Sequence, residues 1–358
     1  MIWILDLTER TPEYSALFAK SLESQGLPIC HLRNGSRQFI SISKILFKKK
    51  SKRRIKRAFV TIEYYFNFVI FCARLVVYRP SILHVQWLPG LELKYPLDLW
   101  ILRSIYRCKI VHTVHNVLPH VNRTHHKKNF ELYYALVDCL IFHNESSLKS
   151  FTSHFGMPLR YEIIPHGLMF ERNIRPNIEL NTPIKLLLLG PIREYKGYLK
   201  FASVFNSLES HSFSLRVAGY TQNQFDIMTL KEMKNVEFLN AFLSEQDFLR
   251  EIDHCDYGVL PYESISDSGL LFAFLSRGIP VILSSIPRFI DYYHQKSILQ
   301  HLLLPKDIYS ESLQAFLDDL KNLNYRSVLD NTIDLQVDYL WESIGPRYLQ
   351  LYEELSNS

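Results

Sequence analysis

Two cations stand in one short loop within KLLLLGPIREYKGYLKF, residues 185–201. The apolar run that ends at Gly190 predicts a buried strand, and a helix is expected to begin near Gly197. Arg193 and Lys196 then lie between these elements, beside the backbone N–H groups of the helix start. Two cations and free N–H groups can stabilise a diphosphate leaving group. The alternative is that both cations are solvated and have no function.

A second loop of this kind lies in PYESISDSGLLFAFLSRGIPVILSS, residues 261–285. The pair Ser268 and Gly269 follows a predicted strand and precedes an apolar helix. Small residues at this place let backbone amides approach a phosphate closely. A Ser-Gly pair is also a common helix cap, so this motif alone is a weak signal.

Three histidines fall within VHTVHNVLPH, residues 111–120. His112 is inside the predicted strand, where a histidine is usually a core residue with its hydrogen bonds satisfied. His115 and His120 lie at the end of the strand or in its loop, where an imidazole can face a ligand. We therefore expect a functional role for His115 and His120, and a structural one for His112.

The elements that position these loops alternate regularly along the chain. Apolar runs typical of strands occur at 2–5, 82–85, 110–114 and 139–143, and the rhythm restarts at 185–190, 214–220, 257–262 and 280–285. Helical stretches separate them, which predicts an α/β protein with two doubly wound parallel sheets. The turn-rich stretch from Pro165 to Pro183 predicts the boundary between them, and Gly345 and Pro346 predict a kinked pair of helices in the tail.

Positive charge is concentrated in one segment. The run KKKSKRRIKR at 48–57 holds eight of the 41 Lys and Arg residues, which leaves 33 basic against 36 acidic residues elsewhere. The apolar stretch 62–78 follows, and its polar interruptions favour a buried or surface-lying helix over a membrane span. The segment predicts contact with an anionic membrane surface, unless it is simply a solvated loop. The residues expected to make this contact are Lys48, Lys49, Lys50, Arg53, Arg54 and Arg57.

Composition excludes several other classes of protein. The chain has 358 residues, of which 47% are hydrophobic, so it can form two domains of ordinary size. Its five cysteines lack CxxC spacing, which argues against a disulfide framework or a zinc site and favours a reducing compartment. The start, MIWILDLTER, is typical of a first strand rather than a signal peptide. Aromatic residues are not interleaved with the basic run, so nucleic acid is not an expected partner.

Five motifs, taken together, resemble a known enzyme family. They are HTVHNVLPH, IPHG, GPIREYKG, PYESISDSG and YLWESI, and they span nearly the whole chain. Their types and order resemble bacterial retaining glycosyltransferases of family four, also called glycosyltransferase group 1. The resemblance implies the GT-B fold, with two Rossmann-like domains facing a central cleft and a last helix that crosses back to the N-terminal domain. The implied domains are an acceptor-binding domain at 1–166, a nucleotide-sugar-binding domain at 167–338 and the C-terminal helix at 339–358.

The implied activity is transfer of a hexose from a UDP- or GDP-linked donor to a lipid-linked or glycan acceptor, with retention and without metal or cofactor. This activity belongs to polysaccharide or glycoconjugate biosynthesis. The implied location is cytoplasmic, peripheral at the inner face of the plasma membrane. Two alternatives stay open: a degenerate GT-B partner protein without catalysis, or a GT-B epimerase or phosphorylase acting on a related substrate.

The resemblance also assigns residues. His115, Arg193 and Lys196 would be catalytic, and donor-binding residues beside these two cations would be Gly190, Gly219, Glu263, Asp267, Ser268, Gly269 and Leu270. Thr11, Tyr14, Asn116 and His120 would face the acceptor. One feature departs from the family: many members carry two glutamates where this chain has Ser266 and Phe274. Our hypothesis is that Glu263 or Asp267 replaces them.

Overall fold

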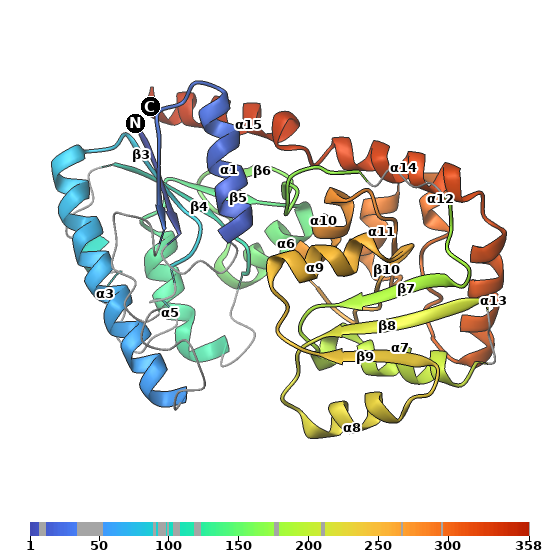
Figure 1. Cartoon of the computed structure of the whole chain (residues 1–358). Coiled ribbons are helices and arrows are strands. Elements are labelled where there is room, and N and C mark those ends of the chain that lie inside the picture. Colours follow the sequence, from blue (N-terminus) through green and yellow to red (C-terminus); the bar gives the residue numbers. More distant parts are fainter. Residues whose placement is uncertain are drawn as a thin grey trace. The chain divides into compact units, whose positions relative to one another are not determined.

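The computed structural model describes residues 1–6, 12–33, 53–88, 91, 98, 100–102, 108–117, 123–174, 179–208, 212–265, 268–294 and 296–357, with only the backbone described for 53–58 and 123–126. The chain divides into two compact units (Figure 1). Unit 1 is Met1–Gly167 with Trp341–Ser358, and unit 2 is Leu168–Leu340. The sequence-based boundaries were 166/167 and 338/339.

Unit 1 contains a six-stranded sheet in the order β2-β1-β3-β4-β5-β6, and every neighbouring pair is parallel. Its strands are β1 (Ile2–Asp6), β2 (Ile29–Arg33), β3 (Ile82–Val85), β4 (Lys109–Thr113), β5 (Cys139–Phe142) and β6 (Tyr161–Ile163). Its helices are α1 (Pro12–Ser24), α3 (Arg53–Tyr78), α5 (Arg123–Tyr134), α6 (Glu145–Phe155) and α15 (Trp341–Ser356). All residues of β1, β3 and β5 are buried, as expected for parallel strands covered on both faces.

Unit 2 contains a five-stranded parallel sheet in the order β11-β10-β7-β8-β9. Its strands are β7 (Ile184–Leu189), β8 (Phe213–Gly219), β9 (Val236–Asn240), β10 (Tyr257–Leu260) and β11 (Val281–Leu283). Its helices are α7 (Tyr198–Asn206), α8 (Gln224–Glu232), α9 (Glu245–Asp253), α10 (Gly269–Ser276), α11 (Pro287–Tyr293), α12 (Ser297–Gln300), α13 (Ser310–Asn322) and α14 (Tyr325–Val337), with a short 3-10 helix, η2 (Glu194–Lys196). The predicted pair of parallel-sheet α/β domains is thereby confirmed.

The C-terminal tail belongs to unit 1, as the predicted fold requires, but it differs in shape from the expectation. The structure has one continuous helix, α15, with Pro346 inside it, where the sequence analysis expected a kinked pair. A Cβ on Gly345 would lie 1.9 Å from Nε2 of Gln25, so this glycine lets α15 approach α1 closely. Ser21 Oγ also donates to the carbonyl oxygen of Trp341 at 3.0 Å. The tail therefore packs on α1 as a single helix with the proline inside it.

Helix α3 has two apolar faces. Its inner face buries Phe68, Phe71 and Leu75 in the core of unit 1, and the polar residues Glu63 and Asn67 are buried as well. By length and composition alone, Phe59–Tyr78 could also span a membrane, although the core helix of a soluble protein can pass the same test. The helix predicted at 62–78 therefore has one face buried in the core of unit 1 and another face exposed. Lys48, Lys49 and Lys50 lie outside the described residues, and for Arg53, Arg54 and Arg57 only the helical backbone is described.

His112 lies in the core of unit 1 and donates from Nδ1 to the carbonyl oxygen of Val85 at 3.0 Å. Burial lowers the pKa of His112 to about 4, although the bond to Val85 acts in the opposite direction. The folded pKa is therefore below the unfolded value of 6.5. Stability that is present above pH 6.5 is lost as the pH falls towards 4, because the unfolded chain takes up the proton first.

This linkage predicts the behaviour of a His112→Asn variant. Asparagine keeps an N–H donor near the position of Nδ1 but does not titrate. The wild type should lose about 2 kcal/mol more unfolding free energy than the variant between pH 7 and pH 5, at about 1.4 kcal/mol per pH unit. All four tryptophans belong to unit 1, so tryptophan fluorescence in urea monitors the correct unit. Equal losses of unfolding free energy in the wild type and His112→Asn would contradict the prediction. His154→Asn, at an exposed histidine, is the control and should behave as the wild type does.

Candidate active site

Parallel strands bring the predicted donor residues to one edge of the unit 2 sheet. Gly190, Arg193 and Lys196 follow β7, Gly219 ends β8, and Ser268 and Gly269 begin α10 after β10. The carboxyl ends of parallel strands form the edge where α/β sheets bind ligands.

Lys196 is the most unusual charge at this edge, because its side chain is only 8% exposed. Its Nζ lies over the rings of Tyr198 and Tyr262, 5.4 Å from each centroid. Burial, together with the nearby charge of Arg193, lowers the pKa of Lys196 to about 8. Among the described residues, no carboxylate forms an ion pair with Lys196, whereas Arg193 is exposed. A buried cation of this kind is stabilised by an incoming anion.

Glycines allow the backbone to come close at the same edge. Gly190 has a φ of +92°, and a Cβ on Gly219 would lie 1.9 Å from the carbonyl oxygen of Gly190. Gly197 has a φ of +66°, and a Cβ there would lie 2.2 Å from the carbonyl oxygen of Pro261. The loops after β7, β8 and β10 are therefore held together by contacts that a side chain would prevent.

Tyr262 joins the loop after β10 to the lysine. Its ring packs against Tyr198, whose hydroxyl donates to the carbonyl oxygen of Leu189 at 2.6 Å. The hydroxyl of Tyr262 also interacts with Ser268, the N-cap of α10. Ser268 in turn accepts from the backbone N–H of Leu271 at 3.4 Å. The first amides of α10 are thereby linked to the residues that surround Lys196.

The structure describes one of the two positions that align with family glutamates and one of the two residues expected to replace them. Phe274 is fully buried, and a Cβ on Gly258 of β10 would lie 2.7 Å from its ring, so this position belongs to the core. Glu263 is exposed, and its N–H donates to the carbonyl oxygen of Tyr195 at 2.9 Å. Leu270 packs partly against the hydrophobic core. Ser266 and Asp267 lie outside the described residues.

Unit 1 collects its polar residues at the corresponding edge of its own sheet. His115 lies just past β4, half-buried, and its ring stacks on Trp87 with centroids 4.7 Å apart. Its Nε2 bonds Oε1 of Gln86 at 2.8 Å. Burial lowers the pKa of His115 well below its usual value, and the neighbouring His143 acts in the same direction. His115 is therefore a neutral imidazole at physiological pH.

The other residues predicted to face the acceptor differ in how deeply they are buried. Tyr14 is 1% exposed, and its ring packs against those of His115, His166 and Trp341. Asn116 is half-buried in the loop after β4. Thr11 and His120 lie outside the described residues.

Four residues at this edge were missed by the sequence analysis: Gln86, Trp87, His143 and His166. His143 directly follows β5, and His166 follows β6 within the IPHG motif. The signal was available for Gln86 and His143, because a polar residue directly after a buried strand is placed at the binding edge of a parallel sheet. It was not available for His166, because β6 is only half-buried and was not predicted.

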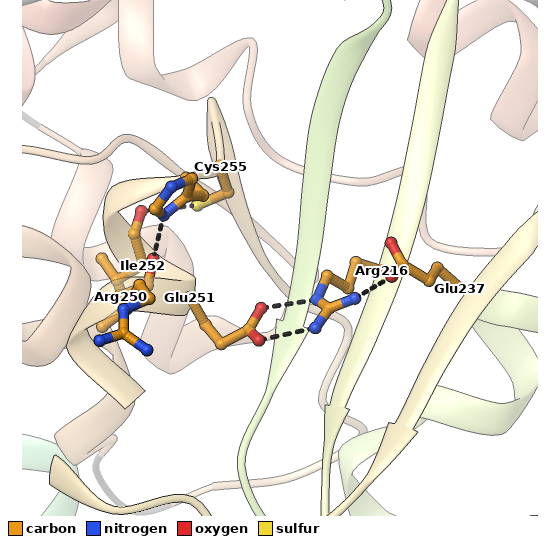
Figure 2. Close-up of polar contacts among 7 residues, drawn as sticks. Arg216, Glu237, Arg250, Glu251, Ile252 and Cys255 are labelled. Carbon is orange, nitrogen blue, oxygen red and sulfur yellow. Dashed lines mark hydrogen bonds and ion pairs between the residues drawn. The ribbon is translucent and has the colours of Figure 1, made fainter. Parts of the chain in front are cut away.

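A hollow of about 840 Å³ lies at the opposite end of the unit 2 strands, where β7, β8 and β9 begin and α9 ends. Arg216 in its lining is held by Glu251, with Nε–Oε2 and Nη2–Oε1 distances of 2.6 and 2.7 Å, and it also bonds Glu237 (Figure 2). The charge of this arginine is thus already compensated. The hollow is therefore not a candidate donor site, because it lies at the wrong end of the strands and the charge of Arg216 is already paired.

Comparisons with known proteins support the fold. No family model matches the chain. A GDP-mannose:glycolipid 4-beta-D-mannosyltransferase of Xanthomonas campestris pv. campestris is 26% identical over 226 residues, or 57% of this chain. The match spans 61% of the length of that transferase.

Solved structures match over almost the whole chain. Sucrose-phosphate synthase from Thermosynechococcus elongatus has a TM-score of 0.70 at 15% identity, with 99% of this chain and 98% of that chain covered. Anabaena HepE in complex with UDP has a TM-score of 0.65 at 10% identity, with 99% of each chain covered. The protein therefore has the GT-B fold, with two Rossmann-like domains in one chain.

Proposed function

We propose that the protein transfers a sugar from a nucleotide diphosphate donor to a lipid-linked or glycan acceptor. The observation that carries this proposal is the buried Lys196 at the carboxyl edge of the unit 2 sheet, with Arg193 nearby and the start of α10 linked through Tyr262. Together they form a receptor for the two negative charges of a diphosphate. Unit 2 binds the donor in this proposal, and unit 1 binds the acceptor.

The leaving diphosphate is the group that requires stabilisation during transfer. As its bond to the sugar breaks, negative charge grows on the phosphate oxygen, and Lys196 and Arg193 stabilise that charge most strongly in the transition state. These two cations do the work that a metal ion does elsewhere, so no metal is assigned to the donor phosphates. The departing phosphate accepts the proton of the acceptor hydroxyl.

The first substrates to test come from the Xanthomonas relative, whose name specifies GDP-mannose and a glycolipid. UDP-linked sugars are the second choice, since HepE was solved with UDP and with UDP-glucose.

The outer face of α3 supports a membrane-bound acceptor. Phe59, Ile62, Phe66, Val69 and Val76 are spaced three, four, three and seven residues apart, and each is 47–66% exposed. We call these five residues the outer stripe. Apolar residues thus point outwards on a helix whose Glu63 and Asn67 point inwards, the reverse of an ordinary surface helix. With the basic run just before it, the stripe suits the anionic inner face of a plasma membrane.

The donor site is tested by replacing Lys196 with methionine. The variant should fold, because methionine fills a similar apolar space without a buried charge. Its affinity for GDP or UDP should fall at least about tenfold, since a charge-assisted hydrogen bond contributes about 1.5–3 kcal/mol. Thermal-shift titration measures the loss, and Lys200→Met, an exposed lysine on α7, is the matched control.

The pH dependence of binding provides a second readout for the same variant. With a pKa of about 8, Lys196 of the free protein loses its proton between pH 7 and pH 9, so wild-type affinity should fall over that range. Lys196→Met should show a flatter profile. If no nucleotide stabilises the wild type at all, the degenerate-partner alternative takes first place.

Transfer itself is tested with GDP-mannose and a diphosphate-linked lipid acceptor. We expect an acceptor-dependent glycolipid product, and an α-linked donor should give an α-linked product if transfer proceeds with retention. The one-bond coupling of the anomeric carbon and proton in NMR identifies the anomer. A β-linked product would mean inversion, and sugar conversion without any acceptor would favour the epimerase.

Membrane contact is tested by flotation with vesicles. The double variant Phe66→Ser/Val69→Ser should bind phosphatidylglycerol vesicles at least about tenfold more weakly, because burial of each large apolar side chain contributes about 1.5–3 kcal/mol. Leu159→Ser, which removes a fully exposed leucine elsewhere in unit 1, should bind as the wild type does. Raising the salt concentration should weaken vesicle binding by every protein that retains the basic run. Equal binding by the double variant would exclude the outer stripe.

A further inference from the structure

Three histidines of unit 1 converge although they lie far apart in the sequence. His115, His143 and His166 follow β4, β5 and β6, which are neighbours in the sheet. One ring nitrogen of each lies within 4.8 Å of one ring nitrogen of both others. His143 and His166 are 5% and 8% exposed, and His115 is half-buried. The cluster is therefore largely shielded, with one side nearer to solvent.

Hydrogen bonds fix which nitrogen of each ring carries a proton. His143 Nδ1 lies 3.0 Å from the carbonyl oxygen of Ile164, and His166 Nδ1 lies 2.6 Å from that of Gly167. A carbonyl oxygen only accepts, so both Nδ1 atoms are donors, and Nε2 is the nitrogen with the lone pair. His115 is reversed: Nε2 donates to Oε1 of Gln86, and Nδ1 has the lone pair.

This arrangement is the one found around metal-binding histidines. Such a ring donates its second N–H to a carbonyl or carboxylate oxygen, which orients the ring and makes the other nitrogen a better ligand. Here all three rings have that support. We propose that His115, His143 and His166 form a three-imidazole site for a divalent transition-metal ion, for which Zn²⁺ is the best match.

The chemistry of the ligands selects the ion. Imidazole nitrogen suits Zn²⁺, Cu²⁺, Ni²⁺ and Co²⁺, whereas Mg²⁺ and Ca²⁺ require oxygen ligands. Zn–N bonds of about 2.0–2.1 Å place tetrahedral ligands roughly 3.4 Å apart, so the rings close by about 1.4 Å at most on binding. Three protein ligands leave a fourth position for water or a substrate oxygen. The site is distinct from the donor phosphates, which the proposed function assigns to cations of unit 2.

The test uses the full chain, freed of any affinity tag and of metal, and titrated with Zn²⁺ and with Co²⁺. We expect one equivalent to bind, with the visible absorption of tetrahedral Co²⁺. Trp87 stacks on His115, so Co²⁺ should also quench part of the tryptophan fluorescence. His143→Asn and His166→Asn keep an N–H donor for the carbonyl oxygens and remove the outer part of the ring, which carries Nε2. Each should weaken binding at least about tenfold and abolish the Co²⁺ spectrum.

The matched control is His154→Asn on α6. His154 is exposed and bonds the carbonyl oxygen of Ser150 from Nδ1 at 2.8 Å, so this change removes an imidazole of the same kind outside the cluster. It should bind Co²⁺ as the wild type does. His115→Gln, which keeps a donor for Gln86, is the third ligand variant if either asparagine variant fails to fold.

Two results would overturn the site: a wild type that shows no tetrahedral Co²⁺ spectrum, or folded ligand variants that bind as tightly as His154→Asn. The proposed function fails separately. Sugar transfer by a protein that binds no metal would exclude only the metal site. Metal binding by a protein that binds no nucleotide would exclude only the donor site.

Discussion

Every strand pair in both sheets is parallel, and this constraint determines where chemistry can occur. All strands of a unit end at one edge, so residues far apart in the chain are brought together without any direct sequence signal. In unit 2 the loops after β7 and β10 meet at Lys196, and Gly219 at the end of β8 packs against Gly190. In unit 1 the residues after β4, β5 and β6 form the histidine cluster. Both candidate sites are consequences of the same topology.

Charge compensation separates ligand sites from structural ion pairs within unit 2. Arg216, at the starting end of the strands, is held by two glutamates, so an anion gains little by approaching it. Lys196, at the carboxyl end, lies over the faces of two tyrosine rings, which compensate a charge weakly, and none of the carboxylates that the structure describes forms an ion pair with it. Lys196 is therefore a buried cation without an ion pair in the described part of unit 2, at the edge where α/β sheets bind ligands. A buried charge without an ion pair therefore indicates a ligand site better than the size of a hollow does.

The sequence predicted most strands because their apolar runs are buried on both faces, as in KLLLLG and ILHV. It missed β2, β6 and β9, which are edge strands in the two sheets. β6 has only three residues, all half-buried, and only the first residue of β9 is buried. The proposed donor residues other than Gly219 lie in two contiguous motifs, so a local pattern could single them out. His143 and His166 could not be grouped with His115, because their proximity depends on the order of strands, which no local pattern specifies. Phe274 could be aligned with a family glutamate, but only the packing against Gly258 shows that it belongs to the core.

The last helix contributes directly to the geometry of the histidine cluster. Trp341, at the start of α15, packs on Tyr14 and Phe18 of α1. A Cβ on Gly167 would lie 2.4 Å from its indole ring, so only glycine permits this contact. The carbonyl oxygen of that glycine is the acceptor for His166 Nδ1, and Tyr14 packs against the His166 ring. Further along α15, Tyr352 bonds the buried His84 at 2.5 Å and holds the helix on the sheet. The C-terminal helix therefore fixes the turn that orients His166, which explains why a segment so distant in sequence must be part of unit 1.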